Sequence, residues 1–168
     1  MRSDDELMAD PAGVPELIGR YERLLLDYFR HNLLDAHRAE DLKQETLLRL
    51  HRERSNYRPQ GKFRSWLFRI AHNLLVDEWQ RRKVRIERPL HEAPDETSRP
   101  PWIVERDESL RRVFEALRQL PPIYREALVL AYYDRVPYAE IAELTGTTPG
   151  AVAVRVHTAL TYLREKIR

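Results

Sequence analysis

The chain lacks cysteine, has little glycine and has no long hydrophobic run. Without cysteine there is no disulfide and no thiolate metal site, a composition that fits a reducing cytoplasm. Only 5 of the 168 residues are glycine. No apolar stretch approaches the roughly 18 residues that suggest a membrane span, and the acidic residues 1–13 do not resemble a signal peptide. We therefore expect a cytoplasmic protein with no membrane partner.

The motifs of common enzyme sites are also missing. The six histidines, at positions 31, 37, 51, 72, 91 and 157, never fall in the HxxxH spacing of a metal-binding helix. There is no P-loop, no GxSxG and no glycine-rich phosphate cradle. The sequence thus predicts no catalytic residue, no metal and no cofactor.

Amphipathic stripes with the 3.6-residue helical period run through most of the chain, and no alternating Val/Ile/Thr run accompanies them. In the first half they predict a helix beginning near Pro15 and helices over 36–54 and 64–83. In the second half, helices are expected from residue 109, from Pro122, over 138–144 and after Thr148. The fold class is therefore predicted to be all-α.

Residues 86–108 separate the two halves. They are rich in proline, contain seven acids and show no helical period, which predicts a flexible acidic linker. The chain is then expected to form a domain of three to four helices over 1–85 and a four-helix domain over 109–168. Residues 49–85 hold eleven basic against three acidic residues. Such a block attracts phosphate groups, although a solvated helix face is the commoner origin of a charge run.

The stretch YAEIAELTGTTPGAVAVRVHTAL has the requirements of a helix–turn–helix. Gly146 can take the left-handed conformation that ends a helix, Thr148 can cap the next helix, and Pro149 can occupy its first position. The expected buried stripe of that last helix is Val152, Val156, Ala159 and Leu163. A recognition helix turns its opposite face to the major groove. The pattern alone also fits an ordinary helical hairpin.

Three stretches carry a family resemblance. AEDLKQETLLRLHR, followed by YRPQGKFRSWLFRIAHNLLVDEWQRRKVR, resembles the promoter −10 domain of sigma factors. LRQLPPIYREALVLAYYDRVPYAEIAELTGTTPGAVAVRVHTAL resembles their −35 domain. In this order the stretches resemble the extracytoplasmic-function (ECF) group of the sigma-70 family. The resemblance implies binding to core RNA polymerase, recognition of −10 and −35 promoter DNA, and DNA melting. It also implies an anti-sigma factor as a candidate partner.

The resemblance assigns the polymerase contact to the helix predicted over 36–54. The family's DLxQE stretch docks on a coiled coil of the polymerase clamp, and it corresponds here to Asp41, Leu42, Gln44 and Glu45. Arg49 lies at helical spacing from Glu45 and can share that exposed face. Without the resemblance, these residues would be interpreted as a solvated helix face.

The loop 55–63 resembles the segment that captures a base flipped out of the −10 element. Flipping costs stacking energy, which aromatic and amide groups in a pocket can offset. The basic helix that follows resembles the promoter-melting helix and offers a positive track to a displaced strand. The expected −10 residues are Tyr57, Gln60, Lys62, Phe63, Arg64, Arg69, Asn73, Asp77, Arg81 and Arg82. Trp66 is expected to lie mainly in the core.

The last helix departs from the family pattern. The −35 residues implied by the resemblance are Thr147, Thr148, Ala153, Val154, Arg155, His157 and Thr158. The family usually has Lys or Arg, then Ser, where Ala153 and Val154 stand, and Arg in place of Thr158. Either the −35 sequence is unusual, or the −10 domain and polymerase carry more of the binding, or this face partly serves a protein partner.

Two other functions fit parts of the sequence. A stand-alone helix–turn–helix regulator accounts for the second domain but not for DLKQE or the flipping loop, and it would bind promoters without polymerase. A sigma-like protein-interaction adaptor accounts for the weakly basic last helix, and it would bind a partner without supporting transcription.

Overall fold

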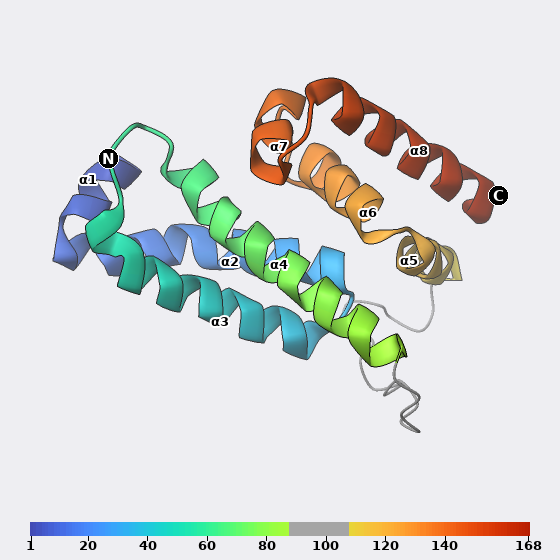
Figure 1. Ribbon diagram of the computed structural model, residues 1–168, viewed down its shortest axis with the longest axis horizontal. Coiled ribbons are helices and arrows are strands. Elements are labelled where there is room, and N and C mark those ends of the chain that lie inside the picture. The colour runs from blue at the N-terminus through green and yellow to red at the C-terminus, as the bar shows by residue number, and fades with distance from the viewer. Residues whose placement is uncertain (88–107) are drawn as a thin grey trace.

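The computed structural model describes residues 1–87 and 108–168, with side chains up to Lys83 in the first range. The N-terminal part is helical (Figure 1). This part contains α1 (Asp4–Ala9), the 3-10 turn η1 (Pro11–Gly13), α2 (Val14–Leu33), α3 (Ala36–Glu53), the 3-10 turn η2 (Arg54–Asn56) and α4 (Phe63–Glu87). The linker predicted for 86–108 falls almost wholly outside the described residues.

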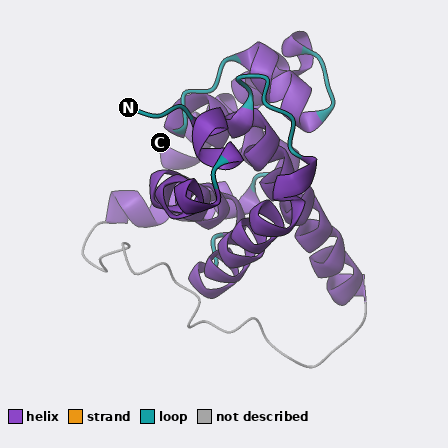
Figure 2. Ribbon diagram, turned by 90° about the vertical axis from the view of Figure 1, so that its left-hand side faces the viewer, coloured by secondary structure: helices purple, strands orange, loops and turns teal. Residues whose placement is uncertain are grey.

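The C-terminal part is also helical. It contains α5 (Glu108–Gln119), α6 (Pro122–Leu128), the π-helical turn η4 (Val129–Tyr133), α7 (Tyr138–Thr145) and α8 (Pro149–Ile167). Across the two described ranges no strand occurs (Figure 2). The predicted all-α fold class, with its two helical parts, is confirmed.

The turn between α2 and α3 follows the predicted break. Leu34 takes a left-handed φ of 55° and its N–H donates to the carbonyl of Arg30, which closes α2. Asp35 then begins α3, because its carboxylate accepts from the backbone N–H of Arg38 at 2.9 Å. These caps set α2 and α3 side by side as the base of the N-terminal part (Figure 1).

Helix α1 was not expected from the sequence. Ser3 and Glu6 form a capping box in which each side chain accepts from the other residue's backbone N–H. Leu7 and Met8 are buried against the core. Gly13 permits the close turn into α2, because a Cβ there would lie 2.4 Å from the carbonyl oxygen of Leu7. The S-x-x-E signature was present in the sequence and marks the helix.

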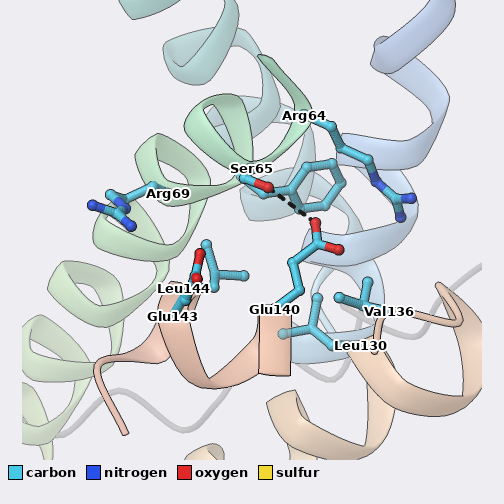
Figure 3. A pocket seen from close by; sticks show the side chains of 9 residues that line it. Arg64, Ser65, Arg69, Leu130, Val136, Glu140, Glu143 and Leu144 are labelled. Atoms are coloured by element: carbon cyan, nitrogen blue, oxygen red, sulfur yellow. Dashed lines mark hydrogen bonds between the residues drawn. The ribbon is translucent and has the colours of Figure 1, made fainter. Parts of the chain in front are cut away.

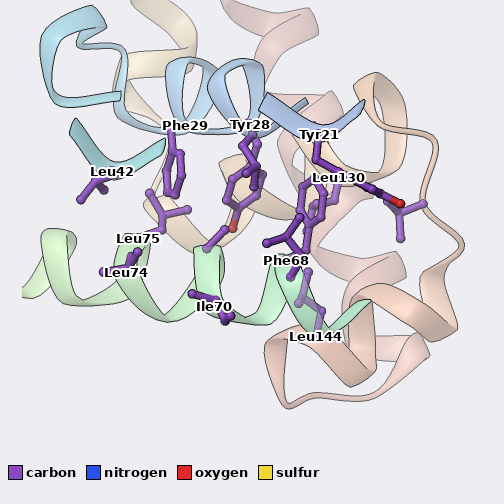
Figure 4. Close-up of a cluster of buried hydrophobic side chains, with 14 of the residues drawn as sticks. Tyr21, Tyr28, Phe29, Leu42, Phe68, Ile70, Leu74, Leu75, Leu130 and Leu144 are labelled. Carbon is purple, nitrogen blue, oxygen red and sulfur yellow. The ribbon is translucent and has the colours of Figure 1, made fainter. Parts of the chain in front are cut away.

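The core of the N-terminal part lies between α2, α3 and α4 (Figure 4). Tyr28 and Phe29 of α2 are fully buried and meet edge-on, with ring centroids 5.3 Å apart. Leu50 of α3 and Leu75 of α4 are equally buried. Each such side chain contributes about 1.5–3 kcal/mol by leaving water. Trp66 is partly buried against this core, as expected.

The two parts of the molecule also pack on each other. Phe68 of α4 lies in one apolar cluster with Leu130 and Leu144 of the C-terminal part (Figure 4). The hydroxyl of Tyr28 donates to the buried carboxylate of Glu126 at 2.6 Å, and the Arg125 guanidinium donates to the carbonyl of Asn32 at 2.6 Å. The C-terminal part therefore rests on α2 and α4.

Candidate nucleic-acid and polymerase interface

The exposed face of α3 is the candidate polymerase surface. Asp41 and Gln44 are exposed, and Glu45 accepts from the Nε of Arg49 at 3.0 Å on the same side. Leu42 lies on the opposite side with 3% exposure. The expectation that Leu42 offers its side chain to a partner is therefore corrected, because its helical position faces the core. The other four residues share one surface, as expected.

Leu48 belongs to this surface and was not singled out from the sequence. It is 51% exposed. It follows Gln44 by four positions and Asp41 by seven, so it stands on the same helical face. That spacing was the available signal. The α3 surface is thus polar at its edges and apolar at Leu48.

The loop between η2 and α4 holds the candidate base-capturing residues. Gln60 and Lys62 are exposed, whereas Tyr57 is half-buried, with its ring 5.0 Å from that of Trp66. Phe63 is only 2% exposed and packs edge-on against Tyr57 and Tyr21. The expectation that the Phe63 ring is available to a base is corrected: the ring supports Tyr57 from behind.

Four of the expected −10 residues form one row on α4. Arg69, Asn73, Asp77 and Arg81 follow each other at intervals of four residues, and all are exposed. Side chains at i and i+4 lie one above the other on a helix. The row therefore presents two cations and two hydrogen-bonding groups along one edge.

Arg82 points away from this row and holds the fold together. Its guanidinium donates to Glu78 at 3.1 Å and to Asp35 at 3.3 Å, and Arg38 donates to the second oxygen of Glu78 at 2.8 Å. Burial alone would raise the pKa of Glu78, but the hydrogen bonds from Arg38 and Arg82 hold it below its usual range. In this arrangement the Arg82 cation pairs with Glu78 of α4 and with Asp35, the cap of α3.

Arg64 is half-covered by the C-terminal part. Its guanidinium donates to the carbonyl of Asp134 at 3.4 Å. The neighbouring Ser65 donates to the carboxylate of Glu140 at 3.0 Å. Figure 3 shows this hydrogen bond as a dashed line, with the side chains of Arg64 and Arg69 on either side of it. The acidic side of α7 thus lies against the start of the basic helix.

Asp134 is the least satisfied acid at this contact. Neither of its carboxylate oxygens has a hydrogen-bond partner, and both are buried. Burial raises the pKa of Asp134 to about 6. The Arg64 cation lowers this pKa, whereas the negative charge of Asp27 raises it further. The contact between α4 and the C-terminal part therefore includes an acid that titrates near neutral pH.

The helix–turn–helix has the predicted caps. Gly146 ends α7 with a left-handed φ of 66°, and the Thr148 hydroxyl accepts from the N–H of Ala151 at 3.2 Å. Pro149 is the first residue of α8. The predicted buried stripe is confirmed at Val152, Val156 and Ala159, and Leu163 is partly buried against it.

The outer face of α8 is nearly uncharged. Val154 is 64% exposed, and His157 and Thr158 are exposed beside it. Arg155 and Ala153 lie half-exposed on its flanks, and Thr147 is half-exposed in the preceding turn. Between 149 and 163, Arg155 is the only Lys, Arg, Asp or Glu. The structure thus brings the expected −35 residues together on a surface of small side chains.

The described residues hold neither a metal site nor a membrane span. Within residues 1–87 and 108–168, no group of three or more His, Asp or Glu residues could hold a metal ion. None of the helices in those ranges is both long and apolar enough to cross a membrane.

Comparison with known families matches both parts of the chain. Residues 17–85 match Sigma-70 region 2, and residues 110–163 match Sigma-70, region 4. The RNA polymerase sigma factor CarQ of Myxococcus xanthus is 33% identical over 160 residues, which cover 89% of this chain and 86% of CarQ. The ECF RNA polymerase sigma factor SigE of Mycolicibacterium smegmatis is 37% identical over 135 residues, which cover 78% of this chain but 52% of SigE.

Two solved structures share the arrangement of helices. The sigma factor RpoE from Bartonella quintana, solved in complex with the anti-sigma factor NepR, superposes with a TM-score of 0.71 at 20% identity, over 91% of this chain and 95% of RpoE. CnrH, solved with the cytosolic domain of CnrY, gives a TM-score of 0.69 at 24% identity, over 98% of this chain and 96% of CnrH. At these identities the likeness concerns the fold.

Proposed function

Because this chain belongs to the extracytoplasmic-function group of the sigma-70 family, whose members initiate transcription with RNA polymerase, we propose a division of that task among three of its surfaces. The α3 surface binds core polymerase, the α4 row with the 55–63 loop contacts the −10 element, and α8 contacts the −35 element. The chain is an initiation factor and not an enzyme, since the polymerase performs the chemistry. The order of the two family matches along one chain supports this assignment most directly.

The polymerase contact is proposed for Asp41, Gln44, Glu45, Arg49 and Leu48. The charged groups supply direction and rate of association, and a central apolar residue supplies burial. Leu48 stands between the polar residues and has the exposure that such a contact needs. Exposed charges alone would also fit a solvated helix face, and the exposed leucine adds the apolar group that a protein contact needs.

The −10 contact is proposed for the α4 row and for Tyr57, Gln60 and Lys62 in the loop. Cations along one edge follow a phosphate backbone, while an aromatic ring can stack on a displaced base. The exposure of Arg69 and Arg81 at one edge of α4 supports this role. Phe63 and Arg82 serve the same surface indirectly by packing and ion pairing.

The −35 contact is proposed for the outer face of α8. Small side chains can touch thymine methyl groups, and Arg155 can reach a guanine or a phosphate. With so little charge, the helix contributes little affinity of its own. We therefore expect α8 to act only once polymerase and the −10 surface have placed it on DNA.

We further propose that residues 1–85 and 109–168 work as two domains joined by the 86–108 linker. Arg64 is half-covered by the C-terminal part, so full use of the basic helix requires the two parts to separate. An anti-sigma factor is a candidate partner, because RpoE, which shares this fold, was solved in complex with the anti-sigma factor NepR. The proposed location is the cytoplasm, where bacterial polymerase is found.

The test is transcription of genomic fragments by purified bacterial core polymerase, with and without this chain. Defined start sites that depend on the chain would support the proposal, and their alignment would show what the α8 face prefers. Binding to core without any start sites would favour the adaptor, for which the nearly uncharged α8 is the specific argument. Promoter binding without polymerase would favour the stand-alone regulator.

A further inference from the structure

Helix α1 is tied to the −10 loop by hydrogen bonds at both ends of the loop. The Asp5 carboxylate accepts from the Tyr57 hydroxyl at 2.5 Å and from the Gly61 N–H at 2.7 Å. At the other end, the Arg54 guanidinium donates to the carbonyls of Met8 and Ala9 at 2.8 and 3.1 Å. A six-residue helix at the start of the chain thus holds a loop that lies fifty residues later.

The loop depends on such contacts for its shape. Between η2 and α4 its backbone belongs to no regular element. Gly61 takes a left-handed φ of 68°, a conformation that L side chains rarely adopt. Asp5 accepts from the N–H of this same residue, so one carboxylate sets both the turn at Gly61 and the position of the Tyr57 ring.

The Tyr57 hydroxyl is a durable donor in this contact. Burial, and then the hydrogen bond to Asp5, raise the pKa of Tyr57 well above its ordinary value. The hydroxyl therefore stays protonated at any pH in which the protein is active. On its other side the ring rests on Trp66 and Phe63, so Asp5 and the aromatic cluster together restrict its orientation.

A cavity of about 500 Å³ lies where α1 meets the loop. Met8 and Ala9 line it from α1, and His51, Arg52, Arg54, Ser55, Tyr57 and Pro59 line it from the end of α3 and the loop. An aromatic face beside arginines is the combination that binds unpaired bases and their phosphates.

We propose that Asp5 is a positioning residue for base recognition: it holds Tyr57 and Gly61 so that the loop, with the end of α1 as one wall, keeps the shape that receives an unpaired −10 base. This inference rests on the proposed function of the 55–63 loop. Asp5 does not touch the base. It determines which base fits by fixing the pocket before DNA arrives.

The structure allows Asp5 to be changed without detaching α1. Asp4, the neighbouring acid, anchors α1 to α2 by accepting from Tyr21 at 2.5 Å and from Arg20 at 2.8 Å. The buried Leu7 and Met8 add apolar anchorage. Asp5→Ala therefore removes the two loop contacts and leaves those of the helix. Asp5→Asn keeps an oxygen for the Gly61 N–H and an amide that can donate to the Tyr57 oxygen.

The experiment measures base discrimination, not overall activity. Once a promoter is identified, templates with each of the four bases at every −10 position are transcribed by core polymerase with wild type, Asp5→Ala, Asp5→Asn and Tyr57→Phe. Glu16→Ala is the matched control, since Glu16 bonds to Arg20 on α2 and has no loop contact. The readout is the ratio of transcription between the best and the worst base, which does not depend on the fraction of active protein.

We expect Asp5→Ala to lower this ratio about tenfold at one −10 position, the scale of one lost base contact. Tyr57→Phe should lower it less at the same position, and Asp5→Asn and Glu16→Ala should retain it. An unchanged ratio in Asp5→Ala overturns the inference, and so does an equal loss on all templates, which would indicate a structural role. If the wild-type chain supports no promoter-dependent transcription at all, the proposed function fails first and this inference falls with it.

Discussion

Helices α4 and α8, the two helices that we propose as DNA contacts, differ in how much charge they carry and in how much of their surface is exposed. Helix α4 carries many charges, but part of them is engaged in the fold: Arg82 is bonded to Glu78 and Asp35, and Arg64 is half-covered by the C-terminal part. Helix α8 carries almost no charge between residues 149 and 163, yet Val154 on its outer face is 64% exposed. A count of basic residues therefore measures potential for DNA binding, whereas exposure decides how much of it is available.

This difference suggests a division of labour. Phosphate contacts supply affinity without sequence information, and base contacts supply specificity. On α4 the exposed cations Arg69 and Arg81 can supply the first, while α8 is suited mainly to the second. Neither helix is then sufficient alone, and the polymerase contact that we propose for the α3 surface becomes the anchor for both.

The largest effect on both DNA contacts is expected when the proposed polymerase contact of α3 is removed. We expect Asp41→Ala with Glu45→Ala to weaken binding to core polymerase by about 100-fold or more, since charged hot-spot residues cost several kcal/mol when truncated. Affinity is measured by titrating labelled chain with core, and helicity by circular dichroism. Glu22→Ala, an exposed acid on α2, is the control. Unchanged binding would remove the assignment of α3 as the anchor.

A smaller effect is expected from removing the two exposed cations of α4, which should lower the affinity for promoter DNA. Arg69→Ala with Arg81→Ala should weaken promoter binding by the holoenzyme about 10- to 100-fold. Two lost phosphate contacts should also reduce the slope of log affinity against log salt by about 1.4–1.8. Arg111→Ala on α5, which is exposed and paired with Glu108, is the control. A salt slope equal to that of wild type would show that the row does not touch phosphates.

Helix α8 should respond less in affinity and more in specificity. We expect Arg155→Ala to reduce the dependence of transcription on the −35 sequence by about 3- to 10-fold, the cost of one base or phosphate contact. Thr158→Arg should raise binding to −35 and unrelated DNA alike, because an added cation acts mainly on phosphates. Transcription from −35 variants that is unaltered in Arg155→Ala would mean that α8 does not read DNA.

The smallest expected effect concerns the contact between the two parts. Because burial raises the pKa of Asp134 to about 6, the protonated acid is favoured in the folded state. Its contribution to the free energy of unfolding is complete below the unfolded pKa near 3.8 and is lost as the pH rises through about 6. After discounting for nearby solvent, the loss is about 1 kcal/mol.

Urea unfolding at pH 5.5 and 7.5 measures this change. Asp134→Asn stays neutral and should be more stable than wild type at both pH values, by a larger margin at pH 7.5 than at pH 5.5. Glu143→Gln, an exposed acid on the neighbouring α7, is the matched control. If the free energy of unfolding changes by the same amount between pH 5.5 and 7.5 in wild type and in Asp134→Asn, the role given to Asp134 is contradicted.

Much of the local structure was predictable, because it depends on neighbours in the sequence. The caps at Gly146 and Thr148 and the buried stripe from Val152 to Ala159 follow from rules that act within one or two turns of helix. The same rules were sufficient to find α1 from Ser3 and Glu6, but its acidic composition suggested a polar end of the chain. The π-helical turn at Val129–Tyr133 carries no comparable local signal.

The sequence predicted which elements carry the candidate site, but not which of its side chains are exposed. The sequence predicted Phe63, Arg64 and Arg82 among the −10 residues, in the loop and on the helix that carry the other candidates. It could not show that Phe63 is buried, or that Arg64 and Arg82 are engaged by groups seventy and forty-seven residues away. Helical period tells which residues share a face, whereas the tertiary partners decide which faces remain open.

The sequence by itself determined most of the helices, the caps of the helix–turn–helix and the family, because propensity, period and motif are local properties of the chain. Only the tertiary structure decided that Asp5 reaches Tyr57 and Gly61, that Glu126 receives Tyr28, and that acids of the C-terminal part cover the start of α4. The physical reason is that burial and hydrogen bonding between distant residues depend on how the helices pack. No pattern along the chain specifies that packing one residue at a time.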